Sequence, residues 1–107
     1  MIWCEGRYRE AVIDLQVRKE SGQVVATSRG FERTQALIDL DPAVFPMLAG
    51  LCAYLDTVFN QRQIPILRAE LERLPATLIP EPARSGIRRF ATMVEEGHHL
   101  HLWFCGD

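Results

Sequence analysis

Residues 98–107 read HHLHLWFCGD and are the most informative stretch of this sequence. Apolar side chains recur at every second position through Leu100, Leu102 and Phe104, which is the pattern of a β-strand with one buried face. A strand needs a neighbour, because its backbone N–H and C=O groups must otherwise go unpaired. We therefore expect a strand here that pairs with an N-terminal strand and turns these three side chains towards helices.

The N-terminal part of the chain predicts that neighbour. Residues 10–18 (EAVIDLQVR) alternate between apolar and polar side chains with one exception. The turn-forming residues 19–22 follow, and Gly22 can adopt a positive φ. Residues 24–27 (VVAT) are again typical of a strand, so the sequence predicts a β-hairpin over residues 10–28. Residues 2–4 form either another short strand or the lead into the first one.

Two helices are predicted in the second half. In residues 60–74 the apolar positions Ile64, Leu67, Leu71 and Leu74 share one helical face, and Glu70 falls outside that stripe. Residues 80–97 predict a second helix, which opens on Pro80-Glu81-Pro82 and stops at Gly97. Its buried stripe comprises Ile87, Phe90, Ala91 and Val94. The short linker 76–79 makes the two helices antiparallel neighbours.

The segment between the hairpin and the first helix is harder to interpret. Residues 30–40 form either a short helix capped by Thr34 or a third strand. Asp41 followed by Pro42 is typical of a helix start, and residues 44–55 are predominantly apolar. Pro46 and Gly50 interrupt that run, so we expect either a broken helix or a helix followed by a loop.

These elements predict one domain spanning residues 1–107 with an α+β fold. An antiparallel sheet, made of the N-terminal hairpin and the C-terminal strand, forms one layer. Two or three helices pack on it as the second layer.

Composition excludes several classes of protein. The formal charge of −2 and the pI of about 5.9 give no electrostatic drive towards nucleic acid. No apolar run is long enough for a membrane span, and no secretory signal opens the sequence. Cys4, Cys52 and Cys105 follow neither metal-finger nor secreted-disulfide spacing. We therefore expect a cytoplasmic protein.

Two segments together resemble a family of small uncharacterised bacterial proteins. Residues 56–63 read DTVFNQRQ and match a D-T-V-F-N-x-x-Q helix start, and residues 99–107 match a terminal H-L-x-L-x-F-x-G-D strand. Residues 40–42 and 45–48 are similar as well, whereas residues 51–55 (LCAYL) lack the acidic or Tyr-Gly pair common in that family. The resemblance implies a bacterial origin and supports the fold boundaries. The family has no established activity, so it supplies no catalytic residue.

The histidines are the candidate metal ligands. On a strand, His99 and His101 project from the same face, roughly 7 Å apart, and Cys105 shares that face. Two imidazoles so placed can bind zinc or copper, and Cys4 could join them from a neighbouring strand. The alternative is that His99, His101 and Trp103 form the solvent or interface side of the strand. We expect no cofactor, with zinc as the alternative.

Cysteine catalysis is not favoured by the sequence. A cysteine nucleophile needs a base and an orienting group. Histidines lie close to Cys105 in the sequence and are expected near Cys4, but no residue is a candidate for the orienting group. Cys52 lies in an apolar run and is most simply a small core residue.

Other polar side chains have two interpretations each. Asp56 and Asn60 either cap the following helix or, with Thr57 and Gln63, form a polar cluster for an anion or a partner loop. Arg84 and Arg88 lie one turn apart and form either a solvated face or a patch for an acidic partner.

The sequence favours a non-catalytic protein-binding or regulatory module, of which an immunity-type protein is one form. Trp103 is its expected anchor, because tryptophan and arginine dominate interface energetics. Its partner is another protein or a second copy of itself through an exposed strand edge. The alternative is a small metal-dependent enzyme that uses His99 and His101.

Overall fold

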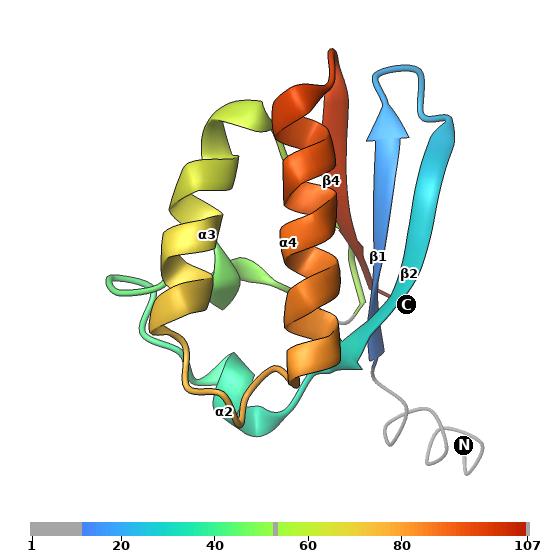
Figure 1. Ribbon diagram of the computed structural model, residues 1–107. Helices are drawn as coiled ribbons and strands as arrows, with labels where there is room; N and C mark the ends of the chain where they lie inside the picture. The colour runs from blue at the N-terminus through green and yellow to red at the C-terminus, as the bar shows by residue number, and fades with distance from the viewer. Residues whose placement is uncertain (1–11, 53, 107) are drawn as a thin grey trace, which may run out of the picture.

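The computed structural model of the protein describes residues 12–52 and 54–106. The predictions made for residues 2–4, for Cys4 and for the first two residues of the hairpin lie outside the described residues. Within the described ranges the chain forms a two-layer α+β fold, with one layer of strands and one of helices (Figure 1). The fold class expected from the sequence is therefore confirmed.

The sheet has four strands, β1 (Val12–Lys19), β2 (Val24–Glu32), β3 (Thr57–Phe59) and β4 (Leu100–Cys105). Their order across the sheet is β2-β1-β4-β3, and every neighbouring pair is antiparallel. Strand β4 pairs with β1 along its full length, as the alternation in residues 98–107 predicts. Strand β4, the last in the sequence of the described strands, therefore lies inside the sheet between β1 and β3.

The helices cover one face of this sheet. They are α2 (Gln35–Ile38), α3 (Ile64–Arg73) and α4 (Glu81–Glu96), with two short 3₁₀ turns, η1 (Leu48–Gly50) and η2 (Gln61–Gln63). In Figure 1, α3 and α4 lie side by side and run in opposite directions in front of the strands. Both helices were predicted, including their antiparallel arrangement.

The register sorts the strand residues onto two faces. Leu15 lies opposite Phe104, and Val17 lies opposite Leu102, so these four side chains share the helix-covered face. All four are completely buried. The intervening positions of β1 and β4 therefore belong to the opposite, helix-free face, because successive side chains of a strand alternate between faces.

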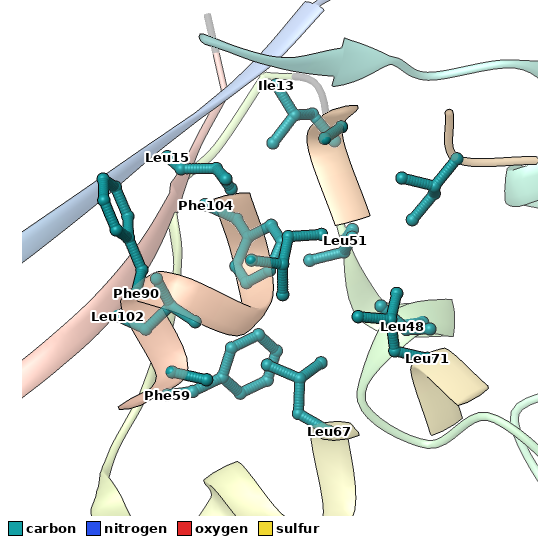
Figure 2. Packing of buried hydrophobic residues seen from close by; sticks show 14 of the residues in the cluster. Ile13, Leu15, Leu48, Leu51, Phe59, Leu67, Leu71, Phe90, Leu102 and Phe104 are labelled. Atoms are coloured by element: carbon teal, nitrogen blue, oxygen red, sulfur yellow. The ribbon is translucent and has the colours of Figure 1, made fainter. Parts of the chain in front are cut away.

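Phe104 lies at the centre of the buried layer. Its ring makes edge-on contacts with Phe31 of β2 at 6.2 Å and with Phe59 of β3 at 5.4 Å between centroids. Figure 2 shows Phe59, Phe104 and leucines of α3 and η1 converging on one cluster. Edge-on aromatic pairs add about 0.5–1.5 kcal/mol each beyond area burial, so one aromatic side chain links three of the four strands.

The edge strand β2 contains a β-bulge where it pairs with β1. Between the pairs Ile13–Phe31 and Leu15–Ser28, strand β2 has one residue more than β1. Gly30 sits in this bulge, where a Cβ atom would lie 1.7 Å from the carbonyl oxygen of Ile13. Only glycine allows the two backbones to come this close.

Two expectations need correction. Residues 41–47 form turns rather than a helix, and Asp41 Oδ1 accepts a hydrogen bond from Ala43 N at 2.9 Å without starting a helix. Residues 57–59, predicted as part of a helix start, form strand β3. Of the two alternatives for residues 30–40, the short helix is confirmed: β2 continues to Glu32, and Thr34 caps α2 by accepting from Leu37 N.

Glu70 is also placed differently from the prediction, because it is completely buried. Its carboxylate accepts hydrogen bonds from Met47 N at 3.0 and 2.9 Å and from Leu48 N at 2.9 Å. Backbone donors of the segment that contains η1 are thus satisfied by a side chain of α3. The regular series of bonds to preceding carbonyls is therefore interrupted at Met47 and Leu48, whose amide groups bond to Glu70 instead.

Candidate functional site

The helix-free face of the sheet presents a tryptophan covered by an arginine. Trp103 lies opposite Gln16 of β1 and Val58 of β3. The Arg18 guanidinium lies 3.9 Å from the centroid of the Trp103 ring, and its Nε donates to Gln16 Oε1 at 2.7 Å. Such a stack attracts the cation to the ring face and holds both groups in one orientation.

Exposed apolar residues lie in strand β3 and in the loop that precedes it. Val58, the direct neighbour of Trp103 in the sheet, is 39% exposed. In the loop leading into β3, Tyr54 is 60% and Leu55 is 69% exposed. Within residues 12–52 and 54–106, strand β3 pairs with β4 alone, so no described strand takes up the backbone groups of its other edge. We call Tyr54, Leu55, Val58 and this edge the β3 surface.

Cys105 lies on the same face near the β3 surface. Burial raises the pKa of the Cys105 thiol, the charge of Asp56 raises it further, and Arg18 opposes the shift. A raised pKa keeps the sulfur protonated at neutral pH, and the thiol is a poor nucleophile and metal ligand. This environment gives no support to catalysis by Cys105.

A hollow of about 450 Å³ opens at the end of the sheet where β1 ends and β4 begins. It brings together three parts of the chain: the end of β1, the segment around η2, and the connection from α4 to β4. The residues that line it are Glu20, Asn60, Gln61, Arg62, Val94, His99, Leu100 and His101.

The two candidate metal-binding histidines both reach this hollow, but not as predicted. His99 precedes β4 and has φ of 58°, so it is not part of the regular strand. Its Nδ1 lies 2.6 Å from Glu20 Oε2. Cys105 is at the opposite end of β4 from His101. Among the described residues, no three His, Cys, Asp or Glu side chains are arranged to hold a metal ion.

Arg84 and Arg88 do not form one surface. Arg84 is 6% exposed and donates to four backbone carbonyls, so its prediction as part of a surface patch was wrong. Arg88 is on the surface and pairs with Glu81 at 3.0 Å and Glu72 at 3.3 Å. The hydrogen bond to Glu81 is the main reason that the pKa of Arg88 is raised.

The remaining predicted residues lie near the sheet. Asn60 forms a capping box, in which its Oδ1 accepts from Gln63 N at 3.1 Å and Gln63 Oε1 accepts from Asn60 N at 2.8 Å. The capping interpretation is thus confirmed for Asn60. Asp56 is exposed just before β3, and it acts on the Cys105 thiol rather than on a helix start.

Sequence reasoning did not single out several residues of these sites, among them Arg18, Glu20, Tyr54, Leu55, Val58 and Arg62. Arg18 and Glu20 acquire their roles from the pairing of β1 with β4, which brings residues 18–20 beside residues 99–103. Tyr54 and Leu55 were assigned to an apolar run with no signal for exposure. The two consecutive large apolar residues directly before Asp56 were the only available hint.

No family model, curated protein or solved structure matches this chain. Within residues 12–52 and 54–106, no helix is both long and apolar enough to cross a membrane.

Proposed function

We propose that this protein is a non-catalytic protein-binding or regulatory module whose partner adds an extended strand at the β3 surface. An immunity-type role is one form of such a module. The observation that carries the proposal is the exposure of Tyr54, Leu55 and Val58 beside a sheet edge that no strand of the described residues covers.

Strand addition fits the chemistry of this edge. Backbone groups of an added strand pair with the edge and give affinity, while alternate side chains give specificity. Val58 would contact side chains of the added strand, and the Trp103–Arg18 stack lies next to it across the sheet. Aromatic residues and arginine are the usual anchors of such interfaces.

The opposite edge of the sheet is less suited to a partner strand. Strand β2 is longer, but its pairing with β1 is irregular at two places, between Ile13 and Leu15 and between Val17 and Arg18. Bulges twist an edge and interrupt the regular row of backbone groups. The short, apolar β3 edge is therefore the one we assign to binding.

A photo-crosslinking amino acid at Val58 tests the proposal in cells that naturally contain the protein. The matched control position is Val44, which is 44% exposed in the turns after α2. We expect a discrete adduct with another protein from position 58 and none from position 44. Leu55→Asp should abolish the adduct, whereas Ile66→Asp, at an aliphatic residue of α3 that is 48% exposed, should not.

Three outcomes would contradict the proposal. They are the absence of an adduct, the same adduct from both positions, or an adduct that contains only two copies of this chain. The last result would assign the β3 surface to a homodimer.

The alternative remains a small metal-dependent enzyme. Its support is that His99 and His101 line one hollow. Native mass spectrometry of protein purified without added metal tests it. One transition metal per chain, lost when both histidines are changed to alanine, would favour the enzyme over the binding module.

A further inference from the structure

The hollow at the end of the sheet has the properties of a small ligand site that is separate from the β3 surface. Its volume of about 450 Å³ lies within the usual range for such sites, roughly 300–1,000 Å³. Val94 is 1% exposed and Leu100 is half-buried, so the lining includes apolar side chains as well as polar ones.

Glu20 contacts both the backbone and the side chain of His99. The φ of His99, 58°, lies in the left-handed region, which non-glycine residues adopt only in a few per cent of cases. Glu20 N donates to His99 O at 3.1 Å, and Glu20 Oε2 lies 2.6 Å from His99 Nδ1. The Glu20 carboxylate accepts from Nδ1 of His99, so Nε2 of the neutral imidazole is a hydrogen-bond acceptor.

The other polar groups of the hollow are mainly donors. Arg62 makes no ion pair with any carboxylate of the described residues. His101 contributes a second imidazole to the lining, and Asn60 adds a side-chain amide. The one carboxylate, that of Glu20, is already engaged with His99. The groups available to a ligand are therefore suited to negative charge, and arginine is the side chain best matched to planar or tetrahedral oxyanions.

We propose that this hollow binds a small organic oxyanion, a carboxylate or phosphate group attached to a short apolar body. Arg62, the side-chain amide of Asn60 and the N–H of the His101 imidazole bind the charged group, and Val94 and Leu100 contact the body. A bare anion would fill only part of the hollow, which is why an attached body belongs to the proposal. This site does not depend on the function proposed for the β3 surface.

The test uses phenyl phosphate, benzoate and the neutral benzyl alcohol as probes of similar shape. Each is titrated, with a chelator present and chloride held to constant ionic strength, into ¹⁵N-labelled protein observed by NMR. We expect saturable shifts of the amide signals of residues 60–62 and 99–101 with at least one of the two anions. The stronger of the two identifies the charged group as phosphate or carboxylate. Benzyl alcohol should bind at least about tenfold more weakly, the difference that one charge-assisted hydrogen bond makes.

Two arginine variants complete the test. Arg62→Gln should weaken binding of the anion by about tenfold or more, whereas Arg29→Gln, at an exposed position of β2, should leave it unchanged. Both residues are exposed, and the amide spectra report directly whether each variant is folded. Unsaturable shifts, equal binding of benzyl alcohol, or equal binding by the two variants would overturn the proposal.

Discussion

The clearest energetic consequence of the structure concerns Arg84, whose replacement by methionine should strongly destabilise the fold. The guanidinium is buried and donates to Leu71 O at 3.0 Å, Leu74 O at 2.6 Å, Pro75 O at 2.7 Å and Ile79 O at 2.9 Å. These carbonyls lie at the end of α3 and in the link to α4. One side chain therefore bonds to four carbonyls of this region and places a positive charge at the C-terminus of α3, where the helix dipole favours it.

The expected loss in the free energy of unfolding follows from the carbonyls that Arg84→Met would leave without a hydrogen-bond donor. Leu71 O keeps a bond from Leu74 N at 3.3 Å, and Pro75 O keeps one from Leu78 N at 3.1 Å. Leu74 O and Ile79 O have no other partner among the described residues. Each buried acceptor left unsatisfied costs about 1–3 kcal/mol, so two of them lower the free energy of unfolding by about 2–6 kcal/mol. Domains of this kind are stable by only about 5–15 kcal/mol.

Urea unfolding followed by far-UV circular dichroism measures this loss. The matched control is Arg88→Met, one turn along the same helix. Arg88 pairs only with Glu72 and Glu81, which are 67% and 71% exposed. Exposed ion pairs contribute little, so the control should unfold at the urea concentration of the unchanged protein. If both variants unfold at that same concentration, the hydrogen bonds of Arg84 do not stabilise the fold and the reasoning is refuted.

Three further outcomes are expected. Glu70→Gln should lower the free energy of unfolding by about 2–4 kcal/mol, measured in urea, because an amide can accept only part of the bonds that the carboxylate accepts from the backbone. Gly30→Ala should cost about 1–3 kcal/mol or more by clashing with backbone, whereas Gly50→Ala, with no atom within 4 Å of the new carbon, should not shift the thermal midpoint. With the other cysteines replaced by serine, Cys105 should react slowly with iodoacetamide at neutral pH, because its pKa is raised. Asp56→Asn should speed the reaction by lowering the pKa of Cys105, and an unchanged rate would contradict this.

The sequence predicted the elements that carry a long, regular pattern. Strand β1 and helices α3 and α4 each repeat their apolar period several times, and β4 repeats it through Leu100, Leu102 and Phe104. Strand β3 was missed because its three residues, Thr57–Phe59, are too few to show alternation. The adjacent capping residue Asn60 was recognised, but the helix start was extended too far towards the N-terminus.

Residues in equivalent sequence positions acquired different roles through tertiary contacts. Arg84 and Arg88 lie one turn apart on the same helix, α4. Only Arg84 contacts the carbonyls of the α3–α4 connection, whereas Arg88 pairs with Glu72. Glu70 lies outside the apolar stripe of α3 and is nevertheless buried, because the backbone of Met47 and Leu48 supplies its partners. Neither placement could follow from local pattern, since each partner lies in another element of the fold.

The sites followed the same rule. His99 and His101 were identified as the candidate histidines. Glu20, which contacts His99, directly follows strand β1, the neighbour of β4 in the sheet. A spacing pattern within residues 98–107 contains no information on that partner. Similarly, Trp103 was expected to anchor an interface, whereas its stacking with Arg18 depends on the register between β1 and β4.

The position of β4 inside the sheet sets the order in which the protein can be assembled during synthesis. The β1–β2 hairpin is local and can form early, but β3 has no partner among the described strands until residues 100–105 have left the ribosome. Val17 must find Leu102 across most of the chain, and such distant pairings form slowly because they close a long loop. Until then the edge of β1 and the buried face around Leu15 stay open to solvent, so the nascent chain depends on late completion of its sheet to avoid aggregation.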